Sequence, residues 1–263
     1  MTVSEMYFET SDHVKLFYTD TQKGNLTLIC IPGIGGSHVL WDQVVDLLKE
    51  QYRVIVTDPR NQGLSQRTPK GETIERHAQD LEELLEYLKI DKAVGMGNSM
   101  GAATLFAYIN KYGANRFLRL VDLDQSPKMI ADPSWQYGFK DLDIDNFLEY
   151  LKLDFGKAHY AHLNHQMVAR AKKEYHDFPY DPKQNYRFLV DHASKDWRNT
   201  LKNLTIPLLI LVGDHSPYFD YNFAKEVASW NKLISYKVIK DCGHLIQAEK
   251  PQELATIIEK FVN

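Results

Sequence analysis

Short apolar segments alternate with longer amphipathic ones toward both ends of the chain. Runs of about four to eight apolar and β-branched residues predict strands, and apolar residues at helical spacing predict helices. The predicted strands are residues 6–9, 14–18, 26–31, 53–57, 92–97, 117–123, 208–212 and 235–239. The predicted helices are residues 39–50, 74–88, 100–111, 221–230 and 251–261. This alternation is typical of a mostly parallel sheet covered by crossover helices, opened here by a β-hairpin.

The alternation stops after the sixth predicted strand. Residues 125–205 are polar and rich in aromatic residues and histidine, with helical stretches but no obvious strand between them. We therefore expect an α/β core formed by residues 1–124 and 206–263. Residues 125–205 should form an inserted helical cap.

Composition and charge exclude several classes of protein. The chain has 263 residues, 44% of them hydrophobic, and a net charge of −4 with both signs mixed along it, so we expect no nucleic-acid partner. No apolar run approaches the ~18 residues of a membrane span, and the opening residues lack the pattern of a secretory signal. The two cysteines, Cys30 and Cys242, form no disulfide framework. These features favour a cytoplasmic protein.

Ser99 is a candidate nucleophile between the predicted strand 92–97 and the predicted helix 100–111. Residues 97–101 read Gly-Asn-Ser-Met-Gly, a G-x-S-x-G pattern that presents a serine hydroxyl on a strained turn above the sheet. The flanking glycines let strand and helix approach closely. The helix start directs N–H groups toward an oxyanion at the serine, so we expect the Met100 N–H to be one donor. The same pattern also forms ordinary tight turns in unrelated proteins.

Further segments in the same order resemble the α/β-hydrolase fold family over nearly the whole chain. Residues 32–37, Pro-Gly-Ile-Gly-Gly-Ser, resemble its oxyanion loop, with Pro32 where a histidine is common, which implies the Ile34 N–H as the second donor. Residues 58–65 are similar to its D-x-R-G-x-G-x-S turn, with Asn61 replacing the first glycine, and are expected to be structural. The resemblance implies an α/β fold: a mostly parallel eight-stranded α/β-hydrolase sheet with helices on both faces and a cap after the sixth strand.

His244 is the candidate base. It follows Cys242-Gly243 after the last predicted strand and precedes Glu249 and Pro251, which matches the family's G-H-x-x-x-x-E-x-P ending. A neutral imidazole can accept the serine proton and return it to the leaving group.

The sequence offers several carboxylates as the third member of the triad. The family's common G-x-x-D would place an aspartate where this chain has Ser216. Some members carry the acid at the end of the strand after the nucleophile helix, where this chain has Asp124, so we favour Asp124 and keep Asp214 as the second choice. Asp220 is a distant third, and Asp122 shares strand parity with Asp124.

These residues predict a serine hydrolase that cleaves an ester-type bond of a small apolar acyl or aryl substrate through an acyl-enzyme. C–C bond hydrolysis, lactone hydrolysis and acyl transfer could use the same triad, and a non-catalytic ligand-binding protein on this fold stays open. The acid position is also that of haloalkane dehalogenases, but those enzymes need an aspartate nucleophile, and Ser99 argues against that chemistry.

The aromatic residues that open the insertion suggest an apolar roof over the serine or a small core of the cap itself. They are Trp135, Tyr137, Phe139, Phe147, Tyr150, Phe155 and Tyr160. His159, His162 and His165 recur every third residue and would share a broad face of a helix, but solvated or packed histidines are favoured over a metal site. We expect no metal and no cofactor, and the pattern leaves the oligomeric state open.

Overall fold

The computed structural model describes residues 4–263 and contains an eight-stranded sheet in the order β1-β2-β4-β3-β5-β6-β7-β8. The first three residues, part of the predicted core, lie outside the described residues. The strands are β1 (Ser4–Glu9), β2 (Lys15–Asp20), β3 (Thr27–Ile31), β4 (Arg53–Thr57), β5 (Ala93–Asn98), β6 (Phe117–Leu123), β7 (Leu208–Gly213) and β8 (Ile234–Ile239). Strand β2 pairs antiparallel with β1 and β4, and the remaining pairs are parallel. The predicted mostly parallel sheet with its opening hairpin is confirmed.

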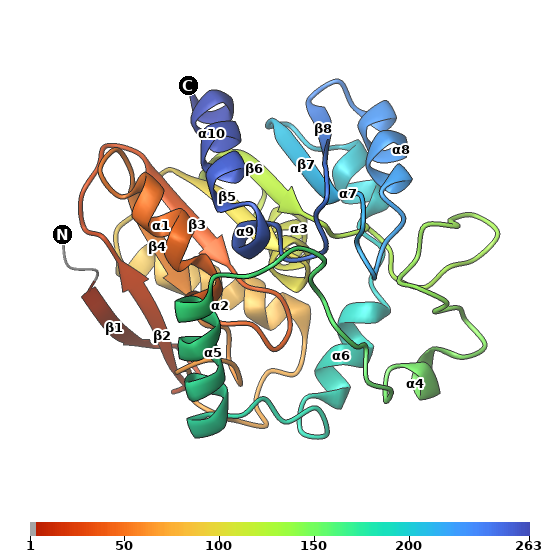
Figure 1. Cartoon of the computed structure of the whole chain (residues 1–263), viewed down its shortest axis with the longest axis horizontal. Coiled ribbons are helices and arrows are strands. Elements are labelled where there is room, and N and C mark those ends of the chain that lie inside the picture. The colour runs from red at the N-terminus through yellow and green to blue at the C-terminus, as the bar shows by residue number, and fades with distance from the viewer. Residues whose placement is uncertain (1–3) are drawn as a thin grey trace.

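Helices cover both faces of the sheet, as predicted (Figure 1). The core helices are η1 (His38–Trp41), α1 (Asp42–Leu48), α2 (Ile74–Tyr87), α3 (Met100–Tyr112), α8 (Asn222–Trp230), α9 (Ile246–Glu249) and α10 (Pro251–Val262). Apolar residues of α1 and α10 pack in one cluster, and those of α2, α3 and α8 pack in a second. Alternate residues of the fully buried β5 and β7 contribute to the two clusters, because successive side chains of a strand point to opposite faces.

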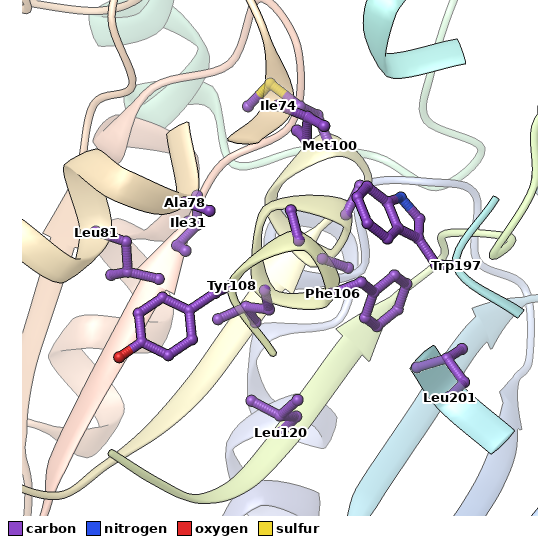
Figure 2. Close-up of a cluster of buried hydrophobic side chains, with 14 of the residues drawn as sticks. Ile31, Ile74, Ala78, Leu81, Met100, Phe106, Tyr108, Leu120, Trp197 and Leu201 are labelled. Atoms are coloured by element: carbon purple, nitrogen blue, oxygen red, sulfur yellow. The ribbon is translucent and has the colours of Figure 1, made fainter. Parts of the chain in front are cut away.

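Four further helices lie between β6 and β7: α4 (Phe147–Tyr150), α5 (His165–Asp177), α6 (Tyr186–Ala193) and α7 (Arg198–Lys202). Helix α7 is anchored by Trp197, which precedes it, and by Leu201 within it. Both side chains belong to the same apolar cluster as Phe106 of α3 and Leu120 of β6 (Figure 2). The return of the chain to β7 is therefore anchored to the core by buried side chains.

Three local expectations differ from the structure. The helix predicted over residues 39–50 begins with a 3₁₀ turn, and the short helix α9 is absent from the prediction. His159, His162 and His165 do not share a helix, because His159 and His162 lie in loops and His165 is the first residue of α5. The three histidines therefore do not lie on a common helix face. Among the described residues, no helix is both long and apolar enough to cross a bilayer.

Candidate active site

Ser99 occupies a sharp turn between β5 and α3 with φ 54° and ψ −123°. A residue other than glycine rarely adopts a positive φ, because this conformation strains the backbone. Such strain is maintained only where the surrounding structure enforces it. The surroundings here are crowded. A Cβ on Gly97 would lie 2.2 Å from the Ala102 nitrogen, and one on Gly101 would lie 2.1 Å from the Ile31 oxygen. The two glycines thus permit the contact between strand and helix that presents Ser99.

His244 lies in the loop between β8 and α9, and its backbone is tied to the serine turn. The side-chain amide of Asn98 donates to the His244 carbonyl oxygen at 3.0 Å and to the Leu123 carbonyl oxygen at 3.0 Å. Gln247 in turn donates to the Asn98 amide oxygen at 3.2 Å. The residue before the serine therefore links the ends of β5 and β6 to the histidine loop, so that residues 99 and 244 line one cavity.

Asp124 is the carboxylate that contacts the histidine. Its Oδ2 lies 2.6 Å from His244 Nδ1, and the same oxygen accepts a hydrogen bond of 2.6 Å from the Ser216 hydroxyl. Asp124 is fully buried and has a positive φ of 64° just beyond the end of β6. Ser216, at the position where G-x-x-D would place an aspartate, thus donates to Asp124.

The other carboxylates considered from the sequence do not make this contact. Asp214 lies 2.8 Å from His215 Nδ1 and 3.5 Å from Lys240 Nζ, and Asp220 accepts from the Asn222 backbone. Asp122 accepts from the Gln125 N–H at 3.0 Å, and its other oxygen is buried without a partner among the described residues. Burial, and secondarily the charge of Asp124, raises the pKa of Asp122 well above its ordinary value. This favours the neutral form of Asp122.

Ile34 and Met100, whose backbone N–H groups are the expected oxyanion donors, both lie near Ser99. Ile34 lies in the loop after β3 and lines the cavity with Ser99, while Met100 is the first residue of α3. Within residues 4–263, neither N–H donates a hydrogen bond to another residue. A free N–H at a helix start is suited to an anion.

The cavity beside Ser99 has a volume of about 250 Å³ and mostly apolar walls. Of the seven aromatic residues expected to roof the serine, Phe139 and Phe155 line it. Trp135 instead packs against Trp230 of α8, with ring centroids 5.4 Å apart. Tyr218, not singled out from the sequence, also lines the cavity and meets the His244 ring edge-on at 4.6 Å. Phe139 and Phe155 thus lie where a roof was expected, whereas Trp135 packs on a helix of the α/β core rather than in a separate core of the cap.

The 58–65 turn is held by buried hydrogen bonds and ion pairs to neighbouring segments, as expected of a structural element. Asp58 is fully buried and accepts from the His38 backbone N–H at 2.6 Å, and His38 Nδ1 lies 2.9 Å from its other oxygen. Arg60 pairs with Asp80 at 2.7 Å and Asp12 at 3.1 Å. The far side of the His38 ring faces Glu174 of α5, with Nε2 3.6 Å from the carboxylate.

The donor atoms of His38, Asp58 and Glu174 lie within 4.8 Å of one another, close enough for a cation. Burial would lower the pKa of His38, but the hydrogen bond with Asp58 and the charges of Asp58, Glu174 and Asp42 outweigh it and raise that pKa. His38 Nδ1 already contacts Asp58 and Nε2 faces Glu174, so these atoms form a polar contact between α5 and the core.

This contact gives a pH-dependent stability. Because the folded-state pKa of His38 is raised, its contribution is fully present below about pH 6.5, the ordinary value for histidine, and is lost as the pH rises through the folded pKa. We expect His38→Gln to lower the free energy of unfolding in urea more at pH 6 than at pH 8, because the stabilising contribution of His38 is lost as the pH rises. His13→Gln, which alters an exposed histidine, is the control. An equal loss at both pH values in His38→Gln would contradict the prediction.

Sequence reasoning missed three residues at this site: Asn98, Tyr218 and His192, the last a buried cavity-lining residue of α6. Asn98 lay inside the serine motif, where its side chain counted as variable. Tyr218 and His192 carry no local signal, because a place on a cavity wall is set by packing across the chain.

Comparison with known proteins finds similarity to α/β hydrolases. A family model described as alpha/beta hydrolase fold matches residues 27–251. The AB hydrolase superfamily protein YisY of Bacillus subtilis is 25% identical, covering 98% of each chain. The 3-oxoadipate enol-lactonase 1 of Acinetobacter baylyi is 25% identical, covering 87% of this chain and 85% of the lactonase. The structure of the esterase EaEST from Exiguobacterium antarcticum superposes with a TM-score of 0.84 at 18% identity, covering 98% of this chain and 99% of the esterase.

Proposed function

The chain belongs to the α/β-hydrolase fold family, and from this we propose that it is a serine hydrolase cleaving ester-type bonds of small, largely apolar substrates. The observation that carries the proposal is the 2.6 Å hydrogen bond between Asp124 and His244, in a cavity that Ser99 also lines. A carboxylate, an imidazole and a strained serine in one buried site match the parts needed for acyl transfer.

In the proposed mechanism, Ser99 Oγ attacks the ester carbonyl carbon while His244 Nε2 takes the hydroxyl proton. Asp124 holds the other ring nitrogen, so the proton on Nδ1 stays in place and the Nε2 lone pair is left free to accept the serine proton. Collapse of the tetrahedral intermediate breaks the bond to the alcohol oxygen, which takes the proton from His244. Water then attacks the acyl-enzyme by the same route, releasing the acid and restoring Ser99.

The Ile34 and Met100 N–H groups would stabilise the negative oxygen of each tetrahedral intermediate. Both are without a protein partner in the described residues, and the N-terminal end of α3 adds the positive end of its dipole. Such donors act on charge that develops in the transition state, and one is typically worth about 3 kcal/mol.

The substrate class follows from the walls of the cavity. Ile34, Phe155 and Leu189 also line a second cavity of about 790 Å³, so the two spaces adjoin along an apolar wall. An acyl chain longer than acetyl would bury more apolar surface there. The names of the lactonase and esterase relatives accord with an ester-type bond.

Ester hydrolysis can be tested with p-nitrophenyl acetate, butanoate and hexanoate. We expect kcat/KM to rise about 10-fold from acetate to the best longer ester, because each buried methylene adds binding that the acetyl group lacks. A fluorophosphonate probe should label Ser99 in the folded protein but not after heat denaturation. The proposal fails if no ester is hydrolysed and Ser99 stays unlabelled.

A further inference from the structure

His192 brings an unused hydrogen-bonding side chain to the cavity that holds Ser99. It lies on α6, is 3% exposed and lines the cavity wall with Met129 and Leu189. Its Nδ1 is buried without a hydrogen-bond partner among the described residues, and burial and the charge of Lys195, rather than any hydrogen bond, set the direction of its pKa. Buried polar groups in folded proteins nearly always have partners, so this ring needs an explanation.

The remaining polar side chains of the cavity wall already have roles. The Asn98 amide bonds the Leu123 and His244 carbonyl oxygens, and the Tyr218 hydroxyl donates to the Gly156 carbonyl oxygen at 3.2 Å. Ser99 and His244 belong to the proposed triad. Across the described part of the wall, His192 is the polar side chain that neither the fold nor the mechanism uses.

The ring is also held in place. Phe188, one turn before His192 on α6, stacks on His77 of α2 with ring centroids 4.3 Å apart and planes 15° apart. The carboxylate of Asp191 accepts from the Ile74 N–H at 2.9 Å, which ties α6 to the start of α2. A hydrogen-bonding group on so constrained a helix is already oriented before a ligand arrives.

The charge state of the ring limits which ligand it suits. Burial, reinforced by the positive charge of Lys195, lowers the pKa of His192 to about 4. The imidazole is therefore neutral near pH 7 and offers one N–H and one lone pair. An anionic group would gain no ion pair from it and would lose its hydration in an apolar cavity, whereas a keto or hydroxyl oxygen matches it.

We propose that His192 is a specificity-determining residue that hydrogen-bonds an uncharged keto or hydroxyl oxygen on the substrate, set apart from the ester group that Ser99 attacks. This inference rests on the proposed function, since the oxygen belongs to an ester in the Ser99 cavity. The substrate would then be an oxygenated ester rather than a purely hydrocarbon one. The oxygen could lie on the acyl side or on the alcohol side.

Matched ester pairs test the proposal and separate the two sides. On the acyl side, p-nitrophenyl 4-oxopentanoate is compared with p-nitrophenyl pentanoate. On the alcohol side, 4-oxopentyl butanoate is compared with pentyl butanoate. We expect the unmodified protein to favour the oxo ester in kcat/KM by about 10-fold or more in at least one pair, because the alkyl partner leaves the imidazole unpaired.

Variants then assign the preference to the ring. His192→Met should reduce the oxo-to-alkyl ratio to about 1, and His192→Gln, which keeps a donor and an acceptor, should retain part of it. His176→Met, at an exposed position of α5, is the matched control and should retain the full ratio. The ratio within one protein cancels any general loss from mispacking, and comparing that ratio between proteins cancels any intrinsic reactivity of the oxo esters.

The outcomes separate this inference from the proposed function. Ester hydrolysis with a ratio near 1 in both pairs for the unmodified protein overturns the role of His192 alone, and this result needs no folded variant. A full ratio in His192→Met, or a preference for the anionic p-nitrophenyl glutarate monoester over the 4-oxopentanoate, overturns it as well. Absence of any ester hydrolysis together with an unlabelled Ser99 overturns both proposals.

Discussion

Replacing Ser99 with alanine is expected to lower kcat for ester hydrolysis by about 10⁵- to 10⁶-fold, the loss typical when a serine nucleophile is removed. KM should change little, because the cavity walls stay intact and the missing hydroxyl acts mainly in the transition state. Steady-state kinetics with the best p-nitrophenyl ester, supported by circular dichroism to verify folding, measure the effect.

Ser229→Ala is a suitable control for that variant, because Ser229 is exposed on α8 far along the chain from the serine turn. It should keep kcat within about twofold of the unmodified protein, as exposed substitutions do in general. A folded Ser99→Ala variant that kept a tenth or more of the original kcat would remove Ser99 from the mechanism.

Asp124→Asn is expected to lower kcat by about 10⁴-fold, the effect seen when the triad carboxylate becomes an amide. The amide cannot stabilise the imidazolium, and by donating from its nitrogen it favours the wrong tautomer of His244. Asp214→Asn is the matched control, since Asp214 lies at the end of the neighbouring strand but contacts His215 and Lys240. A large loss in Asp214→Asn with none in Asp124→Asn would transfer the role to Asp214.

A second-site variant sharpens this test. Ser216 Oγ lies 2.6 Å from Asp124 Oδ2, which itself lies 2.6 Å from His244 Nδ1. A carboxylate at position 216 can therefore approach the same ring nitrogen. Adding Ser216→Asp to Asp124→Asn should restore kcat by about 10-fold or more, and no gain in a folded double variant would mean that the strand ends cannot exchange this role.

Local patterns in the chain were sufficient for the sheet, the serine turn and the histidine loop. The strands at residues 53–57 and 117–123 were predicted with their observed ends, because alternation and turn residues act over a few positions. Ser99 could be identified because the glycines that its turn requires are its neighbours in sequence. His244 could be identified because the residues around it form a family motif.

The tertiary structure alone decided which carboxylate contacts His244. It also decided which aromatic rings and which further histidine, His192, line the Ser99 cavity. Asp124 and Asp214 both directly follow buried, neighbouring strands, so their positions do not separate them, and the difference is the contact that Asp124 makes with His244 and Asp214 does not. The long insertion has no strong periodicity from which to read a buried face. Contacts between residues distant in sequence depend on how helices pack, and that information is distributed over the whole chain rather than held in any short segment of it.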